Sequence, residues 1–260
     1  MIFITTFAYA LGWNMGMERA AAEFRRQLEH PDNDSLPVVR TITRLRKLDT
    51  VCLWLDCGAT RLAESRSRGF HQAVQSDADV WFTCDDDCEA TLETLDWMIE
   101  AVRDRPTVCL APYWARLSEL QEERINLKIP PLPEGLTRTF RELKGGGKTM
   151  PAEAGGLGLV AASKQAVQRI AEHNAELSYV DTEGTKRCAL FIEYIRQPDQ
   201  FWMGEDLAFF SRIPPDVNIE AVVTGNTMHN GRVLELEMLV MGAVRLGDTD
   251  ATNHSLTTSN

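Results

Sequence analysis

Short apolar runs alternate with amphipathic stretches in the N-terminal part of the chain. The apolar runs occupy residues 2–9, 51–55, 80–84 and 107–111, and they are nearly continuous, as in strands that are covered on both faces. The stretches between them have helical spacing and contain no proline, at residues 18–28, 62–74 and 92–102. This alternation predicts an α/β fold with a mostly parallel central sheet flanked by helices.

The pattern breaks between residues 119 and 151, where prolines and a run of glycines cannot continue regular structure. We expect a mobile loop at residues 129–151, beside the site. The polar segment 247–260 contains no aromatic residue and is expected to be disordered. Residues 1–246 are then expected to form a single domain with two halves, 1–112 and 113–246.

Composition narrows the classes of function. The 260 residues include 27 basic and 38 acidic side chains, a net charge of −11, which argues against nonspecific binding to nucleic acid or anionic membranes. The net charge does not exclude a local basic groove, because arginines cluster at residues 40–47 and 61–68. No apolar run approaches the ~20 residues of a membrane span, and no secretion signal is recognisable, so a cytoplasmic location is expected. The six cysteines favour buried, reduced thiols over a zinc site, although Cys84 and Cys88 are four residues apart.

The strongest chemical signal is the acidic triplet Asp85, Asp86 and Asp87, which follows a buried strand directly. Side chains alternate along an extended chain, so Asp85 and Asp87 are expected on one side. A divalent cation relieves the repulsion between two such carboxylates, and Mg²⁺ and Mn²⁺ prefer oxygen ligands. Ligands of parallel α/β sheets bind where this triplet lies, at the carboxyl ends of strands. A helix cap is the alternative, but three acids exceed what one cap needs.

Residues 81–87 resemble the Asp-x-Asp motif of GT-A glycosyltransferases, which binds a divalent metal and the donor diphosphate. Upstream, residues 65–69 resemble the stretch whose arginine holds the nucleotide, and residues 55–60 resemble the strand-end segment that contacts the nucleobase. The second segment departs from the family pattern at Ala59. The resemblance implies that the donor is bound by Thr6, Asp56, Arg66, Arg68, Asp85 and Asp86.

Three later segments extend the resemblance to residue 231. Residues 154–160 resemble the glycine-rich strand beneath the transferred sugar, which implies a donor-binding role for Gly155 and Gly156; an ordinary turn and strand is the alternative. Residues 203–212 resemble the Gly-Glu-Asp segment that opens a helix, which implies catalytic roles for Glu205 and Asp206, with Asp206 as base. Helix-start acids without a catalytic role are the alternative.

The last of these segments, residues 228–231, resembles the His-x-Gly that closes the site. The resemblance implies that His229 joins Asp87 and Asp85 as a ligand of Mn²⁺ or Mg²⁺. Neutral imidazole suits manganese and leaves coordination positions for phosphate oxygens.

The segment Gly145–Thr149 ends like a phosphate-binding loop but lacks the first glycine of that motif and a preceding strand. We interpret it as part of a hinged lid, from which Lys148 reaches the diphosphate.

Taken together, the matches imply a GT-A (Rossmann-like) fold similar to family 2 glycosyltransferases. Residues 1–112 are expected to bind the nucleotide-sugar, and residues 113–246 to form a small acceptor-side subdomain. The implied reaction moves a sugar from a nucleotide-diphosphate donor, UDP-linked above all, to a hydroxyl of a glycan, a small molecule or a modified DNA base, with inversion if Asp206 is the base. A noncatalytic sugar-nucleotide-binding module and a sugar nucleotidyltransferase are the alternatives. The apolar segment 233–246 either closes the domain or forms a homodimer seam.

Overall fold

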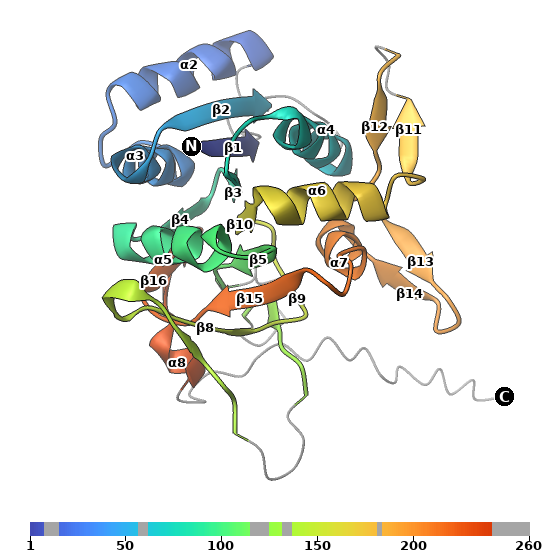
Figure 1. The fold of residues 1–260 in the computed structure, drawn as a ribbon. Helices are drawn as coiled ribbons and strands as arrows, with labels where there is room; N and C mark the ends of the chain where they lie inside the picture. The colour runs from blue at the N-terminus through green and yellow to red at the C-terminus, as the bar shows by residue number, and fades with distance from the viewer. Residues whose placement is uncertain (8–15, 57–61, 115–124, 132–136, 181–183, 241–260) are drawn as a thin grey trace, which may run out of the picture.

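An eight-stranded mixed sheet forms the centre of the chain in a computed structural model, which describes residues 1–7, 16–56, 62–114, 125–131, 137–180 and 184–240 (Figure 1). Strand β10 is antiparallel to both of its neighbours, and β8 is antiparallel to both of its own, so the other six strands share one direction. In sheet order the strands are β2 (Val51–Asp56), β1 (Ile2–Phe7), β3 (Val80–Asp85), β10 (Leu159–Ser163), β5 (Thr107–Leu110), β15 (Asn218–Val222), β8 (Lys148–Pro151) and β7 (Arg141–Glu142).

Helices cover both faces of this sheet. On one face α3 packs on α5 and α2 packs on α3, whereas α4 and α6 pack together on the other (Figure 1). The expected α/β fold with a mostly parallel, helix-flanked central sheet is confirmed. The helices are α2 (Met17–Glu29), α3 (Pro37–Leu48), α4 (Leu62–Gln75), α5 (Leu92–Arg103), α6 (Lys164–His173), α7 (Glu205–Ser211) and α8 (Glu237–Val240), with a short 3₁₀ turn at Lys144–Gly146. Among the described helices, none has both the length and the apolar character needed to cross a membrane.

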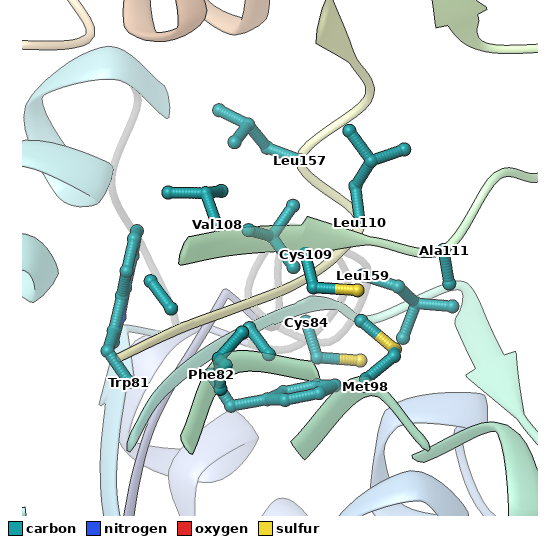
Figure 2. Close-up of a cluster of buried hydrophobic side chains, with 14 of the residues drawn as sticks. Trp81, Phe82, Cys84, Met98, Val108, Cys109, Leu110, Ala111, Leu157 and Leu159 are labelled. Atoms are coloured by element: carbon teal, nitrogen blue, oxygen red, sulfur yellow. The ribbon is translucent and has the colours of Figure 1, made fainter. Parts of the chain in front are cut away.

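The core lies on the two sides of β3 and β10, whose residues alternate between the faces. Trp81 contacts Phe70 of α4 edge to face, with ring centroids 5.2 Å apart. Its neighbour Phe82 points to the opposite face, where Met98 of α5 also lies (Figure 2). Both sides of β3 are therefore fully covered, which explains the continuous apolar run seen in the sequence.

Smaller sheets lie beside the central sheet, and most of their strands come from the C-terminal half of the chain. Two hairpins stand beside α4 and α7 (Figure 1). The first hairpin is β11 (Ser178–Val180) with β12 (Lys186–Cys188), and the second is β13 (Tyr194–Arg196) with β14 (Phe201–Met203). A three-stranded sheet consists of β17 (Arg232–Glu235), β16 (Asn226–His229) and β4 (Cys88–Ala90), and β6 (Leu127–Lys128) pairs with β9 (Ala154–Gly155).

Two segments differ from the sequence-based expectation. Helix α3 was not expected; it begins at Pro37, whose fixed φ and missing N–H suit the first helical turn. Residues 148–151, expected within a mobile loop, form β8 and pair with β15 in the central sheet.

The apolar segment from residue 233 closes the domain in its first part, because Leu234 and Leu236 are buried in the core. Residues 132–136 and the tail 247–260 lie outside the described residues.

A buried carboxylate holds the outer edge of the sheet, at β7 and β8, together. Glu220 of β15 is 7% exposed and accepts hydrogen bonds from Arg141 at 2.5 Å and from Thr149 at 2.8 Å, and it also pairs with Arg105. These partners belong to β7, β8 and the turn before β5. A buried carboxylate is stable only with such partners, so Glu220 fixes the positions of the two outer strands.

Replacing this carboxylate tests that role. We expect Glu220→Gln to lower the free energy of unfolding by about 1–3 kcal/mol, because it leaves two arginines without their anion. Glu142→Gln is the matched control: Glu142 is paired with Lys148 at 3.0 Å but is 66% exposed, so the expected loss is below about 1 kcal/mol. Urea unfolding of both variants measures the difference, and equal losses would contradict the assignment.

Candidate metal centre and acidic site

Three parallel strands end at the same level, and this edge positions the site. Phe7 at the end of β1 lies between Asp56 of β2 and Asp85 of β3 in the strand register. The backbone N–H of Asp85 donates to the Gly158 carbonyl of the neighbouring chain segment at 3.0 Å. The two carboxylates therefore stand at the carboxyl ends of strands, where α/β sheets bind ligands.

Arg66 is the charged centre of this edge. It projects from α4, is 3% exposed, and donates to Asp85 Oδ2 at 3.1 Å. Its Nη2 lies 3.9 Å from Asp206 Oδ1, and its guanidinium carbon lies 5.5 Å from the centroid of the Phe7 ring. Burial lowers the pKa of Arg66, but the nearby charges of Asp85, Asp206 and Glu205 raise it by more. Arg66 is therefore charged and links α4, β3 and α7.

Asp206 stands in the first turn of α7 and is partly shielded from water. Its side chain is 28% exposed, yet Oδ1 is buried and has no hydrogen-bond partner among the residues that the structure describes. Burial raises the pKa of Asp206 to about 7; the charges of Glu205 and Asp85 add to this effect and that of Arg66 opposes it. A carboxyl group with this pKa changes its protonation near neutral pH, as a general base must.

A second group of side chains gathers just beyond the end of β3. Strands β4 and β16 are antiparallel, and Cys88 lies directly opposite His229 in their register. Asp87 precedes β4, and its Oδ2 lies 3.3 Å from His229 Nε2. Cys88 Sγ lies 3.6 Å from Asp87 Oδ1. Among the described residues these three form a group whose ligand atoms all lie within 4.8 Å of one another.

The hydrogen bonds of His229 determine which nitrogen is available to a ligand. Nδ1 lies 2.6 Å from the carbonyl oxygen of Trp114, and a carbonyl only accepts, so we assign the proton to Nδ1. Nε2 then carries the lone pair, accepts from the Asn230 side-chain amide at 3.3 Å, and lies 3.3 Å from Asp87 Oδ2, so a cation bound there would replace the Asn230 contact. The ring also packs on Tyr113, with centroids 4.8 Å apart. A hydrogen bond from the other ring nitrogen to a backbone carbonyl is a usual support of a metal-binding histidine.

The donor atoms of this group fit a divalent cation: a carboxylate, an imidazole nitrogen and a thiol converge from two strands. Asp87 is 18% exposed, which gives a cation access from its side. Burial raises the pKa of the Cys88 thiol well above its ordinary value, and the charge of Asp85 adds to this effect. Without a cation, the thiol is therefore neutral.

Close packing against other side chains of the protein requires the glycines of residues 155–158. A side chain at Gly156 would place Cβ 2.0 Å from the hydroxyl of Tyr113 and 2.2 Å from Asn126 Nδ2. A side chain at Gly158 would place Cβ 2.6 Å from Cys88 Sγ. The Tyr113 hydroxyl accepts from the Gly158 backbone N–H at 3.1 Å. Residues 155–158 therefore pack closely against Tyr113, and the ring of Tyr113 packs against that of His229.

Other residues expected at the site have partners within the protein. The Thr6 hydroxyl is buried and donates to the Cys84 carbonyl at 2.7 Å, and Asp56 accepts from Ser65 at 2.7 Å. Arg68 pairs with Glu64 on the surface of α4 at 2.7 Å. Residues 57–60 of the expected nucleobase segment lie outside the described residues.

Three further residues that the sequence predicted at the site lie outside the acidic site and outside the group of Asp87. Asp86 is 8% exposed and does not belong to the group of Asp87. Gly155 pairs with Leu127 in the small sheet of β6 and β9. Lys148 lies in β8, four strand positions from β3 or about 19 Å along the sheet, and pairs with Glu142. The acidic site thus contains Asp85, Asp206 and Arg66, with Glu205 beside them.

Sequence reasoning placed Cys88 among the buried, reduced thiols and did not indicate Tyr113, but both belong to the site. Cys88 directly follows the acidic triplet, and a cysteine in that place was the available signal. Its closeness to His229 depends on a pairing between strands that are about 140 residues apart along the chain. Tyr113 carries no motif, and only packing reveals its contacts.

No protein-family model and no curated protein matches the chain. Solved structures with a similar arrangement include A197 from STIV, at 11% identity and a TM-score of 0.44, over 90% of this chain and 92% of that one. GalNAc-T7 with UDP, GalNAc and Mn²⁺ matches at 14% identity and a TM-score of 0.43, over 88% of this chain but 43% of that one. Mannose-1-phosphate geranyltransferase from Thermus thermophilus matches at 11% identity and a TM-score of 0.34, over 90% and 74%. Likenesses this weak identify neither activity nor substrate.

The pKa of Asp206 predicts a pH dependence of stability. Its folded-state value of about 7 exceeds the ordinary 3.8, so between these values the folded chain holds a proton that the unfolded chain has lost. Stability therefore falls as pH rises through this window. We expect the stability of Asp206→Asn relative to the wild type to be higher at pH 8 than at pH 5 by about 1–3 kcal/mol, because the uncharged side chain does not ionise in this window.

Urea unfolding at the two pH values tests this expectation. Asp199→Asn is the control, because the hydrogen bond from Arg196 lowers the pKa of Asp199, so its loss brings no gain at pH 8. If Asp206→Asn gains no stability relative to the wild type between pH 5 and pH 8, the raised pKa is wrong.

Proposed function

We propose that this chain is a metal-dependent glycosyltransferase that moves a sugar from a nucleotide-diphosphate donor to a hydroxyl acceptor. The observation that carries the proposal is the meeting of two groups at the carboxyl edge of β3. One is the Asp85–Arg66–Asp206 network, and the other is the group of Asp87, Cys88 and His229. Together they supply a proton acceptor and a cation site, as transfer from a diphosphate requires.

The metal centre serves the leaving group. Asp87 and His229 would hold a divalent cation, Mn²⁺ or Mg²⁺ in the simplest form of the proposal. Bound there, the cation supplies Lewis-acid stabilisation of the charge that grows on the departing diphosphate. Asp85, held by Arg66, adds an anchored carboxylate next to this centre. UDP is the nucleotide that the sequence resemblance favours.

Asp206 serves the acceptor. In its ionised form it takes the proton of the attacking hydroxyl while that oxygen bonds to the anomeric carbon, and the configuration at this carbon inverts. Burial and the neighbouring Glu205 raise its pKa to about 7, which makes it a stronger base than an exposed aspartate while half of it stays ionised near neutral pH. The positive charge of Arg66 offsets part of the repulsion between the carboxylates of Asp85 and Asp206.

The hairpin of β13 and β14 is proposed as one wall of the acceptor site. Ile195 and Trp202 lie directly opposite each other in this hairpin and are 52% and 58% exposed. Trp202 stands three residues before Glu205, at the start of α7. An exposed aromatic side chain four residues before the proposed base Asp206 offers a flat apolar surface to an acceptor. A homodimer through residues 233–246 stays a prediction.

Nucleotide release is the direct test. We expect purified protein to release nucleoside diphosphate from one member of a panel of UDP-, GDP- and TDP-sugars, only with divalent cation present. Asp87→Ala is expected to lower this rate by at least about 10²-fold, because it removes a metal ligand. Asp77→Ala is the control, since the Asp77 side chain is fully exposed and lies 3.8 Å from Lys164, so its rate is expected to match the wild type.

Other outcomes would replace the proposal. Donor binding by calorimetry without consumption, even with a broad set of hydroxyl acceptors, points to a noncatalytic binding module. Synthesis of the sugar nucleotide from a sugar phosphate and a nucleoside triphosphate points to a nucleotidyltransferase. Full activity of Asp87→Ala rules out this metal site.

The base assignment has its own test. We expect kcat to rise with pH through an apparent pKa near 7, and Asp206→Asn to lower kcat by about 10²–10⁴-fold, since a positioned base contributes that much. Glu205→Gln is the matched control and is expected to shift the apparent pKa downward instead, because the Glu205 charge raises the pKa of Asp206. Proton NMR of the product should show an inverted anomer, and retention would refute the role of Asp206.

A further inference from the structure

We propose that Cys88 is itself a ligand of the metal, as a thiolate, so that the centre prefers Zn²⁺ or Co²⁺ to Mg²⁺ and Mn²⁺. This inference deepens the proposed function and rests on it, because it concerns the same metal site. It changes the chemistry expected there from an oxygen-rich site to one with oxygen, nitrogen and sulfur donors.

Strand pairing places the sulfur at the centre. Cys88 and His229 are directly opposite each other in the antiparallel pair of β4 and β16, and side chains at such positions lie on the same face. The pairing is extended beyond β16, where the backbone N–H of Asn230 donates to the Asp87 carbonyl at 3.2 Å. The rigid backbone of two paired strands therefore fixes the relation of the three side chains.

The distances between donor atoms match those of a tetrahedral site. Bond lengths typical of zinc put a ligand oxygen and a ligand nitrogen about 3.4 Å apart, and an oxygen and a sulfur about 3.6 Å apart. The observed distances are 3.3 Å from Asp87 Oδ2 to His229 Nε2 and 3.6 Å from Asp87 Oδ1 to Cys88 Sγ. The two contacts use different oxygens of Asp87, and the ligand atoms of all three residues lie within 4.8 Å of one another.

The neighbouring thiol does not share this arrangement. Cys84 Sγ lies 3.4 Å from the carbonyl oxygen of Asp85 and 3.6 Å from that of Cys88, and it is outside the group of ligand atoms. Cys88 Sγ instead faces the carboxylate and the imidazole. Gly158 leaves room for it, because a Cβ there would lie 2.6 Å from the sulfur.

The donor set determines which cation is preferred. Thiolate and imidazole suit Zn²⁺ and Co²⁺, whereas Mg²⁺ and Mn²⁺ favour carboxylate and water oxygens. Three protein ligands with a fourth position left to water or substrate is the arrangement of catalytic zinc sites. On binding, the Cys88 S–H bond breaks, the metal–sulfur bond forms, and one proton passes to solvent.

Cobalt spectroscopy on the full chain tests the inference. We expect Co²⁺ added to the reduced protein to produce a thiolate-to-cobalt charge-transfer band in the near ultraviolet, which Cys88→Ser abolishes. The matched control Cys84→Ser should retain the band, since its sulfur faces carbonyl oxygens. Calorimetry should show that Cys88→Ser weakens Co²⁺ binding by on the order of tenfold or more, while Mn²⁺ binding changes by less than about threefold.

A measurement on the unmodified chain guards against misfolding of the variant. X-ray absorption at the cobalt edge should show one sulfur at about 2.3 Å. Absence of sulfur from the cobalt shell, a band that survives in Cys88→Ser, or no Co²⁺ binding would each overturn the inference. These readouts need no sugar donor, so failed donor turnover with an intact thiolate band rejects the transferase and leaves the Cys88 ligand standing.

Discussion

The positive charge of a guanidinium group that is almost entirely removed from water must be balanced by nearby anions. Much of the site follows from how this protein balances the charge of Arg66. Its partners are Asp85 at the end of β3 and Asp206 at the start of α7, at 3.1 and 3.9 Å. Asp85 is the nearer anion, and removing it would leave the buried charge uncompensated, which is strongly destabilising in proteins. The same contacts join α4, β3 and α7, so the elements that carry the acidic site are held by the charges that make it.

The charge balance at this point explains why Asp206 differs from an ordinary aspartate. One arginine faces three acids, Asp85, Asp206 and Glu205, so it cannot neutralise all of them. Asp206, which lies farther from Arg66 than Asp85 does, bears the excess, and burial together with its acidic neighbours raises its pKa to about 7. In the proposed reaction this cost to stability is what makes Asp206 a competent base near neutral pH.

The metal centre depends on a different constraint, the register of β4 with β16. That pairing sets Cys88 opposite His229, and the Trp114 carbonyl orients the imidazole. Asp85 and Asp87 are separated by one residue, so the two groups adjoin without sharing a ligand: Asp85 pairs with Arg66, whereas Asp87 faces His229. In the proposed reaction a bound donor would contact both, with its diphosphate at the metal centre and its sugar toward Asp206.

Local patterns in the sequence were sufficient for the strands β1, β2, β3 and β5, for helices α2, α4 and α5, and for the acids at the end of β3 and the start of α7. Continuous apolar runs and helical spacing act within a few residues, so they can be recognised without the fold. The burial of Arg66, the place of Lys148 in β8 and the meeting of Cys88 with His229 were decided by tertiary structure alone. Each depends on contacts between distant segments, and a shift of one residue in strand register would send Cys88 to the other face without changing any local pattern.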